Sequence, residues 1–89
     1  MVKIEFTPNL RRHLAVSAVE APAGTLRSVL DCVFATQERL RGYVLDDQGA
    51  LRKHVSVFID GRRVVDRTRL SDPVGDASVV YVMQALSGG

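Results

Sequence analysis

The sequence predicts a single α+β domain in which one main helix lies across one face of a mixed sheet of four or five strands. Three observations lead to this prediction. Apolar and charged side chains alternate over residues 2–6, apolar side chains recur at helical spacing over residues 26–34, and residues 79–83 are apolar on both faces. These are the patterns of a half-buried strand, an amphipathic helix and a strand in the middle of a sheet. A chain of 89 residues is long enough for one such domain and too short for two.

The first twenty residues predict an antiparallel hairpin. The alternation over residues 2–6 ends at Pro8, because proline cannot donate a hydrogen bond to a sheet and Pro-Asn favours a turn. The alternation returns at Leu14, Val16 and Ala18. These three residues therefore belong to the second strand of the predicted hairpin.

A helix is predicted to follow Thr25, whose hydroxyl is suited to accept the first free amide hydrogen. Apolar residues then occur at i, i+3, i+4, i+7 and i+8, which draws one stripe along a helix. The stripe consists of Leu26, Val29, Leu30, Val33 and Phe34. Gln37 falls on the same stripe and marks the expected end. Cys32 lies about 130° around the helix from the stripe and is expected to be at least partly exposed.

The segment after the helix predicts turns rather than regular structure. Residues 40–45 contain apolar side chains without a clean period, and the Asp-Asp-Gln-Gly sequence of residues 46–49 predicts a turn. Residues 66–77 are expected to be irregular, with Pro73 and Gly75 as turn residues.

A second hairpin and a last strand complete the predicted sheet. Residues 55–59 alternate, and Asp60-Gly61 predicts a type I′ turn because both central positions of that turn need a positive φ. Residues 62–65 are the expected short return strand. Residues 78–84 cannot be the partner of a tight hairpin, so they are predicted to pair in parallel with the first strand.

The charge pattern argues against a nucleic acid as partner. Twelve Lys and Arg residues are interleaved with ten Asp and Glu residues, the net charge is +2, and no basic stripe carries stacking aromatics.

The single Cys32 cannot form an intrachain disulfide, which favours a reducing compartment. No apolar run resembles a signal peptide or reaches the roughly 18 residues of a membrane span. A cytoplasmic protein without membrane partners is expected.

The sequence contains no group of side chains that predicts catalysis or metal binding by the chain itself. His13 and His54 lack ligand spacing and companion ligands, and Asp46-Asp47 fits a turn better than a catalytic pair. Cys32 is interpreted as an incidental surface thiol rather than a persulfide relay, because no histidine or cation is fixed near it in sequence. We therefore expect neither an enzyme nor a bound metal or cofactor.

The last residues of the sequence predict that the reactive group of this protein is its C-terminal carboxylate. Residues 1–85 are assigned to the domain and residues 86–89 to a tail that leaves directly from the last strand. Two glycines at a chosen end occur by chance in only about 0.5% of chains, which makes the pair informative. The alternative is that the glycines belong to an incidental frayed end. Residues without a Cβ pass through the narrow channel that leads to an enzyme's nucleotide site in any backbone conformation. Three residues beyond the last strand reach only about 10 Å, so the body of the protein must dock close to that site. The α-carboxylate of Gly89, preceded by Gly88, is ionised at neutral pH and is able to attack the α-phosphate of ATP.

Two segments carry a resemblance to a known family. They are Gly49-Ala50-Leu51-Arg52-Lys53-His54-Val55-Ser56-Val57-Phe58-Ile59-Asp60-Gly61 and Ala85-Leu86-Ser87-Gly88-Gly89. The first is similar to the hairpin pattern G-x-L-R-x-x-V-x-V-F-V-N-G, with Asp60 where Asn is more usual. In these two segments and in its order of elements, the chain resembles the ubiquitin-like sulfur carriers of the β-grasp fold. The resemblance extends over essentially the whole chain. That group includes the small subunit of molybdopterin synthase and the thiamine-pathway carrier.

The resemblance implies a reaction sequence at Gly89. An adenylyltransferase like the ubiquitin-activating enzymes would use ATP to adenylate its carboxylate, and a sulfurtransferase or sulfide source would convert the adenylate to a thiocarboxylate. The sulfur would pass to a downstream enzyme in amino-acid, tRNA or secondary-metabolite biosynthesis. The alternatives are the small subunit of molybdopterin synthase, a ubiquitin-like protein modifier and a β-grasp binding module that is not activated. The uncharged residues 85–87 argue against protein tagging, and the lack of a proline before the tail argues against molybdopterin synthase.

The last strand also predicts a surface for partner binding. If Val80 and Val82 face the helix, then the alternate side chains of the strand face outward and Phe58 is able to join them. The alternatives are that a loop covers this face or that the two faces are reversed. The candidate partner-binding residues are Phe58, Val79, Tyr81, Met83, Leu86 and Ser87.

Overall fold

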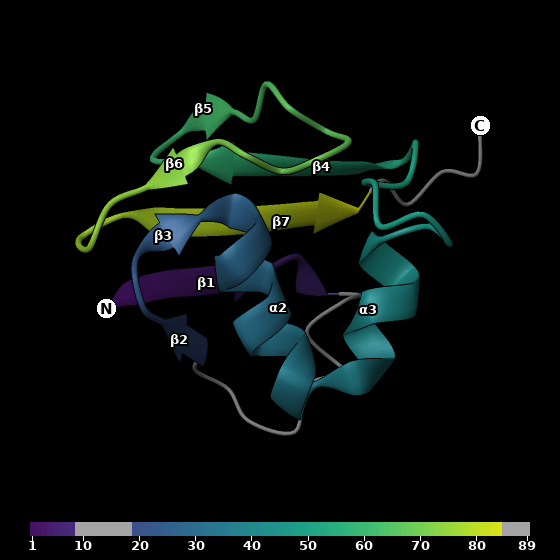
Figure 1. The fold of residues 1–89 in the computed structure, drawn as a ribbon, viewed down its shortest axis with the longest axis horizontal. Coiled ribbons are helices and arrows are strands. Elements are labelled where there is room, and N and C mark those ends of the chain that lie inside the picture. Colours follow the sequence, from purple (N-terminus) through teal and green to yellow (C-terminus); the bar gives the residue numbers. More distant parts are fainter. Residues whose placement is uncertain (9–18, 85–89) are drawn as a thin grey trace.

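The computed structural model describes residues 1–8 and 19–84, and its centre is a five-stranded mixed sheet that carries helix α2 on one face (Figure 1). The strands of this sheet are β1 (Val2–Phe6), β2 (Val19–Ala21), β4 (Val55–Ile59), β5 (Arg62–Arg63) and β7 (Val79–Gln84). Helices α2 (Leu26–Thr36) and α3 (Glu38–Val44) follow one another along the chain. Two short strands, β3 (Gly24–Thr25) and β6 (Pro73–Val74), form a separate pair.

The order of the strands in the large sheet is β2-β1-β7-β4-β5, which confirms that the last strand is central. Strand β7 pairs in parallel with β1, where Ile4 lies opposite Val80, and antiparallel with β4. Strands β1 and β2 pair antiparallel, as the predicted hairpin requires, with Ile4 opposite Val19. The predicted strand residues Leu14, Val16 and Ala18 lie outside the described residues. The predicted fold class is therefore confirmed, with a sheet of five strands.

Helix α2 forms where its sequence pattern predicts it. The Thr25 hydroxyl accepts a hydrogen bond from the backbone N–H of Ser28 at 3.2 Å, and the helix closes at Gln37, whose N–H donates to Val33 O at 2.9 Å. All five residues of the predicted stripe are at most 3% exposed. Burying each of these side chains contributes about 1.5–3 kcal/mol, so the stripe alone explains why α2 lies on the sheet.

The prediction of one main helix was incomplete, because residues 38–44 form a second helix, α3. Leu40 and Val44 lie one turn apart and are fully buried, while the side chains between them are exposed. A helix of seven residues carries only two core positions, and Gly42 lowers its intrinsic helix propensity. The periodicity was too short to detect, and packing of Leu40 and Val44 stabilises the helix.

Two strand boundaries also differ from the predictions. The return strand β5 ends at Arg63 instead of residue 65, because the N–H of Val65 donates to the Asp72 carboxylate at 3.0 Å and not to the sheet. Pro73 and Val74, predicted to be irregular, form β6 and pair with β3 immediately before α2. The first difference arises from a contact within one loop, whereas the second arises from the pairing of two segments that are distant in sequence.

The two predicted turns are confirmed. Asp60 and Gly61 have φ values of 52° and 81°, as a type I′ turn requires. In the turn at residues 46–49, the Asp46 carboxylate accepts hydrogen bonds from the N–H groups of Gln48 and Ala50 at 2.9 and 3.1 Å. Gly49 has a φ of 82°, where a side chain would be strained.

Candidate functional site

The central strand β7 has one face in the core and one face toward solvent. Val80 and Val82 are completely buried, whereas Val79 and Met83 are 37% and 38% exposed and Tyr81 is half-buried. The predicted parity of this strand is therefore right. Helix α2 lies in front of the sheet in Figure 1, so the exposed side chains of β7 are on the far face in that view.

Strand β4 adds an aromatic side chain to the same face. Phe58 pairs with Tyr81 across the two strands and is half-buried, so it joins the outward side chains of β7 as expected. This face carries a shallow hollow of about 650 Å³, and the residues that line it are Phe58, Asp60, Gly61, Val79, Tyr81 and Met83. We call the apolar members of this surface the open-face patch; they are Phe58, Val79, Tyr81 and Met83.

Asp60 holds the edge of the open-face patch in place. Its carboxylate accepts hydrogen bonds from the N–H of Val79 at 2.9 Å and from the hydroxyl of Ser78 at 2.8 Å, and its own N–H donates to Val79 O at 2.9 Å. The hydrogen bonds from Val79 and Ser78 lower the pKa of Asp60 from its usual value, because both stabilise the charged form. The end of β4 is thereby tied to the start of β7.

Sequence reasoning interpreted Asp60 only as a turn residue and missed this second role. Its partners are 18 and 19 residues away, so no local pattern shows the contact. The available signal was the resemblance itself, since Asp60 stands where Asn is more usual. A carboxylate offers two acceptor oxygens to the two donors, whereas an amide offers one.

The described chain ends at Gln84, at the tip of β7 and shortly before the predicted tail of residues 86–89. Gln84 lies opposite Val55 in the sheet, and its N–H donates to the Thr7 hydroxyl at 3.3 Å. The predicted reactive residues Gly88 and Gly89 lie outside the described residues, as do the predicted partner-binding residues Leu86 and Ser87. Their roles stay predictions.

The remaining candidate residues lie away from the open-face patch. Cys32 is exposed on α2, as predicted, and His54 is exposed in the turn before β4. His13 lies outside the described residues. Within residues 1–8 and 19–84, no three His, Cys, Asp or Glu side chains are grouped so that they could hold a metal ion, and no helix is long and apolar enough to cross a membrane.

No protein-family model matches the sequence, and neither does any curated protein. Solved structures do match over the full length. SAMP1 from Haloferax volcanii superposes with a TM-score of 0.81 at 19% identity, covering 99% of this chain and 98% of that one. CysO from Mycobacterium tuberculosis, described as an antigen, gives 0.82 at 21% identity, covering 97% and 100%. A chain of the Amycolatopsis orientalis BexX/CysO complex gives 0.85 at 20% identity, covering 100% of both chains.

The fold is the ubiquitin-like β-grasp. At these identities the likeness establishes the fold and leaves the chemistry to be argued from this chain's own residues. In this β-grasp body, an exposed apolar face and the exit point of the predicted tail belong to the same central strand, because Met83 directly precedes Gln84. A protein bound to the open-face patch is therefore positioned next to the chain that follows β7.

Proposed function

We propose that this chain is a cytoplasmic sulfur carrier whose Gly89 carboxylate is adenylated and then converted to a thiocarboxylate that donates sulfur in a biosynthetic pathway. The observation that carries the proposal is the combination of a full-length β-grasp body with a sequence that ends in Gly88-Gly89 five residues after the central strand. The CysO neighbours, which include one in complex with BexX, support a carrier that works together with partner proteins.

The proposed reaction has two balanced steps. A carboxylate oxygen of Gly89 attacks the α-phosphorus of ATP, which forms an acyl adenylate and releases pyrophosphate. Hydrosulfide then attacks the acyl carbon, AMP leaves with the adenylate oxygen, and one proton is released as the thiocarboxylate forms. An adenylyltransferase supplies the nucleotide site, and ATP is its cosubstrate rather than a cofactor of this chain. The last position of the chain has no side chain, so the acyl carbon is accessible to the nucleophile.

The geometry of the body sets where the adenylyltransferase docks. Five residues beyond Gln84 span at most about 17 Å when fully extended. The nucleotide site must therefore lie within that distance of the tip of β7. The open-face patch begins at Met83 and offers an apolar contact surface at this distance. We assign it as the docking surface for the adenylyltransferase.

The test is intact-mass analysis after incubation of the full chain with ATP, a sulfide source and the adenylyltransferase encoded with it. We expect a mass gain equal to the replacement of one oxygen by sulfur, located on Gly89 by fragmentation. A variant that lacks Gly89 should show no gain, while Asp47→Asn, at an exposed turn residue outside the predicted tail and the open-face patch, should retain it. A folded wild-type chain that gains neither adenylate nor sulfur would contradict the proposal.

A second candidate, a ubiquitin-like protein modifier, is favoured by the names of the neighbours. Three of the β-grasp neighbours are SAMP1, which stands for small archaeal modifier protein 1. A modifier would form an amide bond between Gly89 and lysine side chains of other proteins. Tagged chain expressed in its host should then appear in conjugates of higher mass that are lost in the variant without Gly89. Thiocarboxylate formation without such conjugates identifies the carrier.

A further inference from the structure

The charged residues of the described chain are divided unevenly between two parts of the molecule. Residues 50–70 contain six of the ten Lys and Arg residues of the described ranges but only two of the ten Asp and Glu residues, Asp60 and Asp66. The rest of the described chain carries the opposite excess. We call the six cations the basic edge; they are Arg52, Lys53, Arg62, Arg63, Arg67 and Arg69.

The basic edge follows one margin of the sheet. Strand β5 is the outermost strand, and the chain after it returns alongside β4, where Val64 N–H donates to Val57 O at 2.9 Å. Further along, Leu51 N–H donates to Arg67 O at 2.9 Å, and the Arg67 guanidinium donates to Arg52 O at 2.7 Å. These contacts bring residues 52–53 and 62–69 to the same side of β4.

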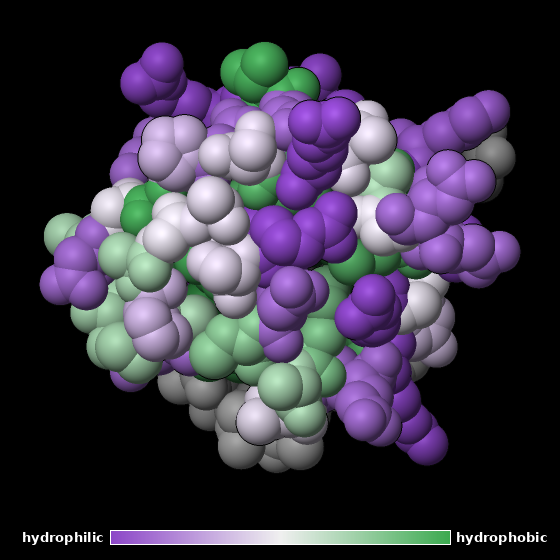
Figure 2. Space-filling view, viewed as in Figure 1, coloured by the Kyte–Doolittle hydropathy of each residue, from purple (hydrophilic) through white to green (hydrophobic). Residues whose placement is uncertain are grey.

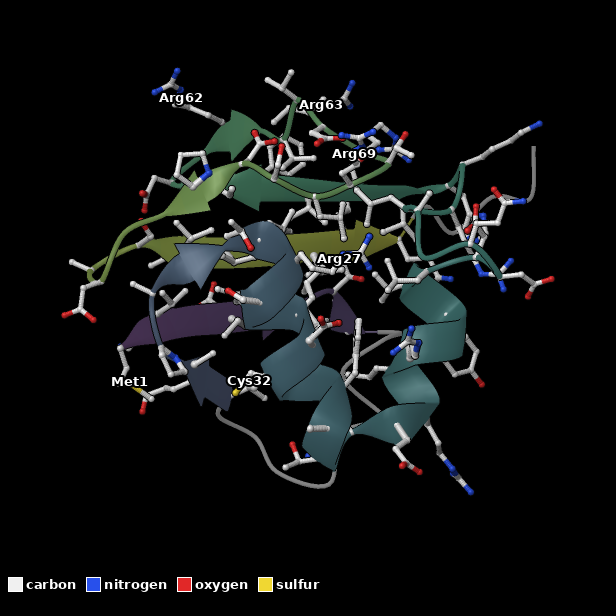
Figure 3. All side chains as sticks on the ribbon, viewed as in Figure 1. Met1, Arg27, Cys32, Arg62, Arg63 and Arg69 are labelled. Carbon is white, nitrogen blue, oxygen red and sulfur yellow. The ribbon has the colours of Figure 1, made fainter. Side chains whose placement is uncertain are left out.

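Figure 3 shows Arg62, Arg63 and Arg69 along the upper margin of the molecule, far from Met1. In Figure 2, hydrophilic side chains gather along the upper and right-hand margins of the visible face. Four members of the basic edge are exposed rather than half-buried: Lys53, Arg62, Arg63 and Arg69.

The charges of the basic edge are not neutralised within the described residues. The ion pair found there joins the N-terminal amine of Met1 to Asp76 at 3.2 Å and involves none of the six cations. The nearby acids are occupied by backbone and hydroxyl donors instead: Asp60 binds Ser78 and Val79, and Asp66 accepts four hydrogen bonds from its own loop. The four exposed cations are therefore available to a partner, whereas Arg52 donates to Gly42 O at 2.7 Å and Arg67 donates to Arg52 O at 2.7 Å.

The basic edge adjoins the open-face patch. Arg63 lies opposite Phe58 in the sheet, and its guanidinium carbon is 5.8 Å from the centre of the Phe58 ring. An apolar centre with a charged rim is the usual composition of a protein–protein interface. On the other side of β7, Lys3 and Glu5 carry opposite charges, so the cationic rim is one-sided.

We propose that the basic edge binds an acidic surface of a protein partner, whose apolar part contacts the open-face patch. That this partner is the adenylyltransferase rests on the proposed function, whereas recognition of an acidic protein surface does not. The observations favour a protein over a nucleic acid, because Arg63 covers the Phe58 ring, the aromatic ring nearest to the cations, and its cross-strand neighbour Tyr81 is half-buried. Neither ring is fully open for a base to stack on. Charges placed on a rim act mainly on the association rate and on its salt dependence.

The experiment is an NMR titration of the full ¹⁵N-labelled chain at neutral pH with a polyglutamate peptide, whose carboxylates are ionised. It is carried out at about 0.02 M and about 0.3 M salt, between which the Debye length falls from about 20 Å to about 6 Å. We expect shift changes confined to residues 50–70 and the open-face patch at low salt, and their loss at high salt. An RNA hairpin is titrated in parallel.

Two charge-reversed variants with the same change in net charge sharpen the test. Arg62→Glu with Arg63→Glu should weaken polyglutamate binding by about tenfold or more, whereas Arg39→Glu with Arg41→Glu on α3 should change it by less than about twofold. Thermal unfolding establishes that both variants fold. Equal effects of the two variants, or shifts spread over α2 and α3, overturn the proposal. Tighter binding of RNA than of polyglutamate through the same residues also overturns it and assigns the edge to nucleic acid.

The mass assay separates this inference from the proposed function. Arg62→Glu with Arg63→Glu should still yield thiocarboxylate at saturating adenylyltransferase, with the loss confined to low enzyme concentrations. Polyglutamate binding at the basic edge in a chain that is never adenylated would overturn the proposed function alone. Adenylation that is insensitive to both salt and the double substitution would overturn the adenylyltransferase as the acidic partner.

Discussion

Asp66 shows how one side chain organises an irregular loop. Its carboxylate accepts hydrogen bonds from the N–H groups of Thr68, Arg69 and Ser71 at 3.2, 2.9 and 3.3 Å, and from the Ser71 hydroxyl at 2.6 Å. These hydrogen bonds, the one from the Ser71 hydroxyl above all, lower the pKa of Asp66 to about 2. The backbone of the loop is irregular, as the sequence predicted, and the hydrogen bonds to Asp66 stabilise its conformation.

The low pKa of Asp66 predicts a pH dependence of stability. Because the folded-state pKa lies below the unfolded-state value of 3.8, the carboxylate contributes stability above about pH 4, and the contribution is lost as the pH falls toward about 2. Asp66→Asn should lower the thermal unfolding midpoint at neutral pH and flatten its fall between pH 4 and 2. Asp47→Asn, at an exposed carboxylate that makes no hydrogen bond with the described residues, is the control. Identical pH profiles for wild type and Asp66→Asn would contradict the assignment.

The open-face patch also makes a prediction at the residue scale. Met83→Ser removes an apolar contact at the end of the patch nearest the tail, so it should raise the KM of adenylation with kcat unchanged. Tyr43→Ser is the control, because Tyr43 is a hydrophobic residue of α3 that is 41% exposed and lies outside both the patch and the basic edge. Steady-state kinetics of pyrophosphate release measures both. Equal KM values for the two variants would remove the patch from the docking surface.

At the scale of elements, the two helices differ in how they are specified. Helix α2 has a side-chain cap and a five-residue stripe, so its sequence alone predicts it. Helix α3 has no side-chain cap bond, and its place depends on two buried side chains. The short β3–β6 pair likewise depends on tertiary contacts. One of them joins the start of α2 to the residue before β6, where Leu26 N–H donates to Asp72 O at 2.9 Å.

The dependence of α3 on packing predicts a large effect of one truncation. Leu40 is completely buried, so Leu40→Ala should cost about 2–5 kcal/mol of unfolding free energy through lost burial and a residual cavity. Arg39→Ala, its exposed neighbour on the same helix, should stay within about 0.5 kcal/mol of wild type. Urea denaturation followed by circular dichroism gives both values. A small effect of Leu40→Ala would mean that α3 does not contribute to the core.

At the scale of the whole molecule, the parallel β1–β7 pair joins segments from opposite ends of the sequence. Lys3 lies opposite Val79, and Lys3 N–H donates to Ser78 O at 3.2 Å. Arg27 closes the other side, because its guanidinium donates to Gly49 O at 2.8 Å and to Thr68 O at 3.2 Å. Within the described residues, these contacts tie the two ends of the body and the loops after β4 to the sheet and α2.

This organisation predicts that body and tail are separable. Removal of residues 86–89 should leave the unfolding free energy within about 0.5 kcal/mol of wild type, since the domain is predicted to end at residue 85 and β7 is paired with β4 as far as Gln84. The same deletion should abolish the mass gain that marks thiocarboxylate formation. Thermal unfolding and intact mass, measured on one preparation, test both expectations. Marked destabilisation by the deletion would show that the tail is part of the domain.

The sequence by itself determined which side chains of α2 and β1 face the core, because period 3.6 and period two each assign a face when one face is apolar and the other polar. That is why the α2 stripe and, from its two apolar faces, the central position of β7 were predicted. The outward face of β7 was decided only by the burial of Val80 and Val82 in the folded protein. Only the tertiary structure decided where α3 and β6 form, which donors Asp60 binds, and that six scattered cations share one margin. Each of these features depends on a short element or on residues that are separated in the sequence and become neighbours only when the chain is folded.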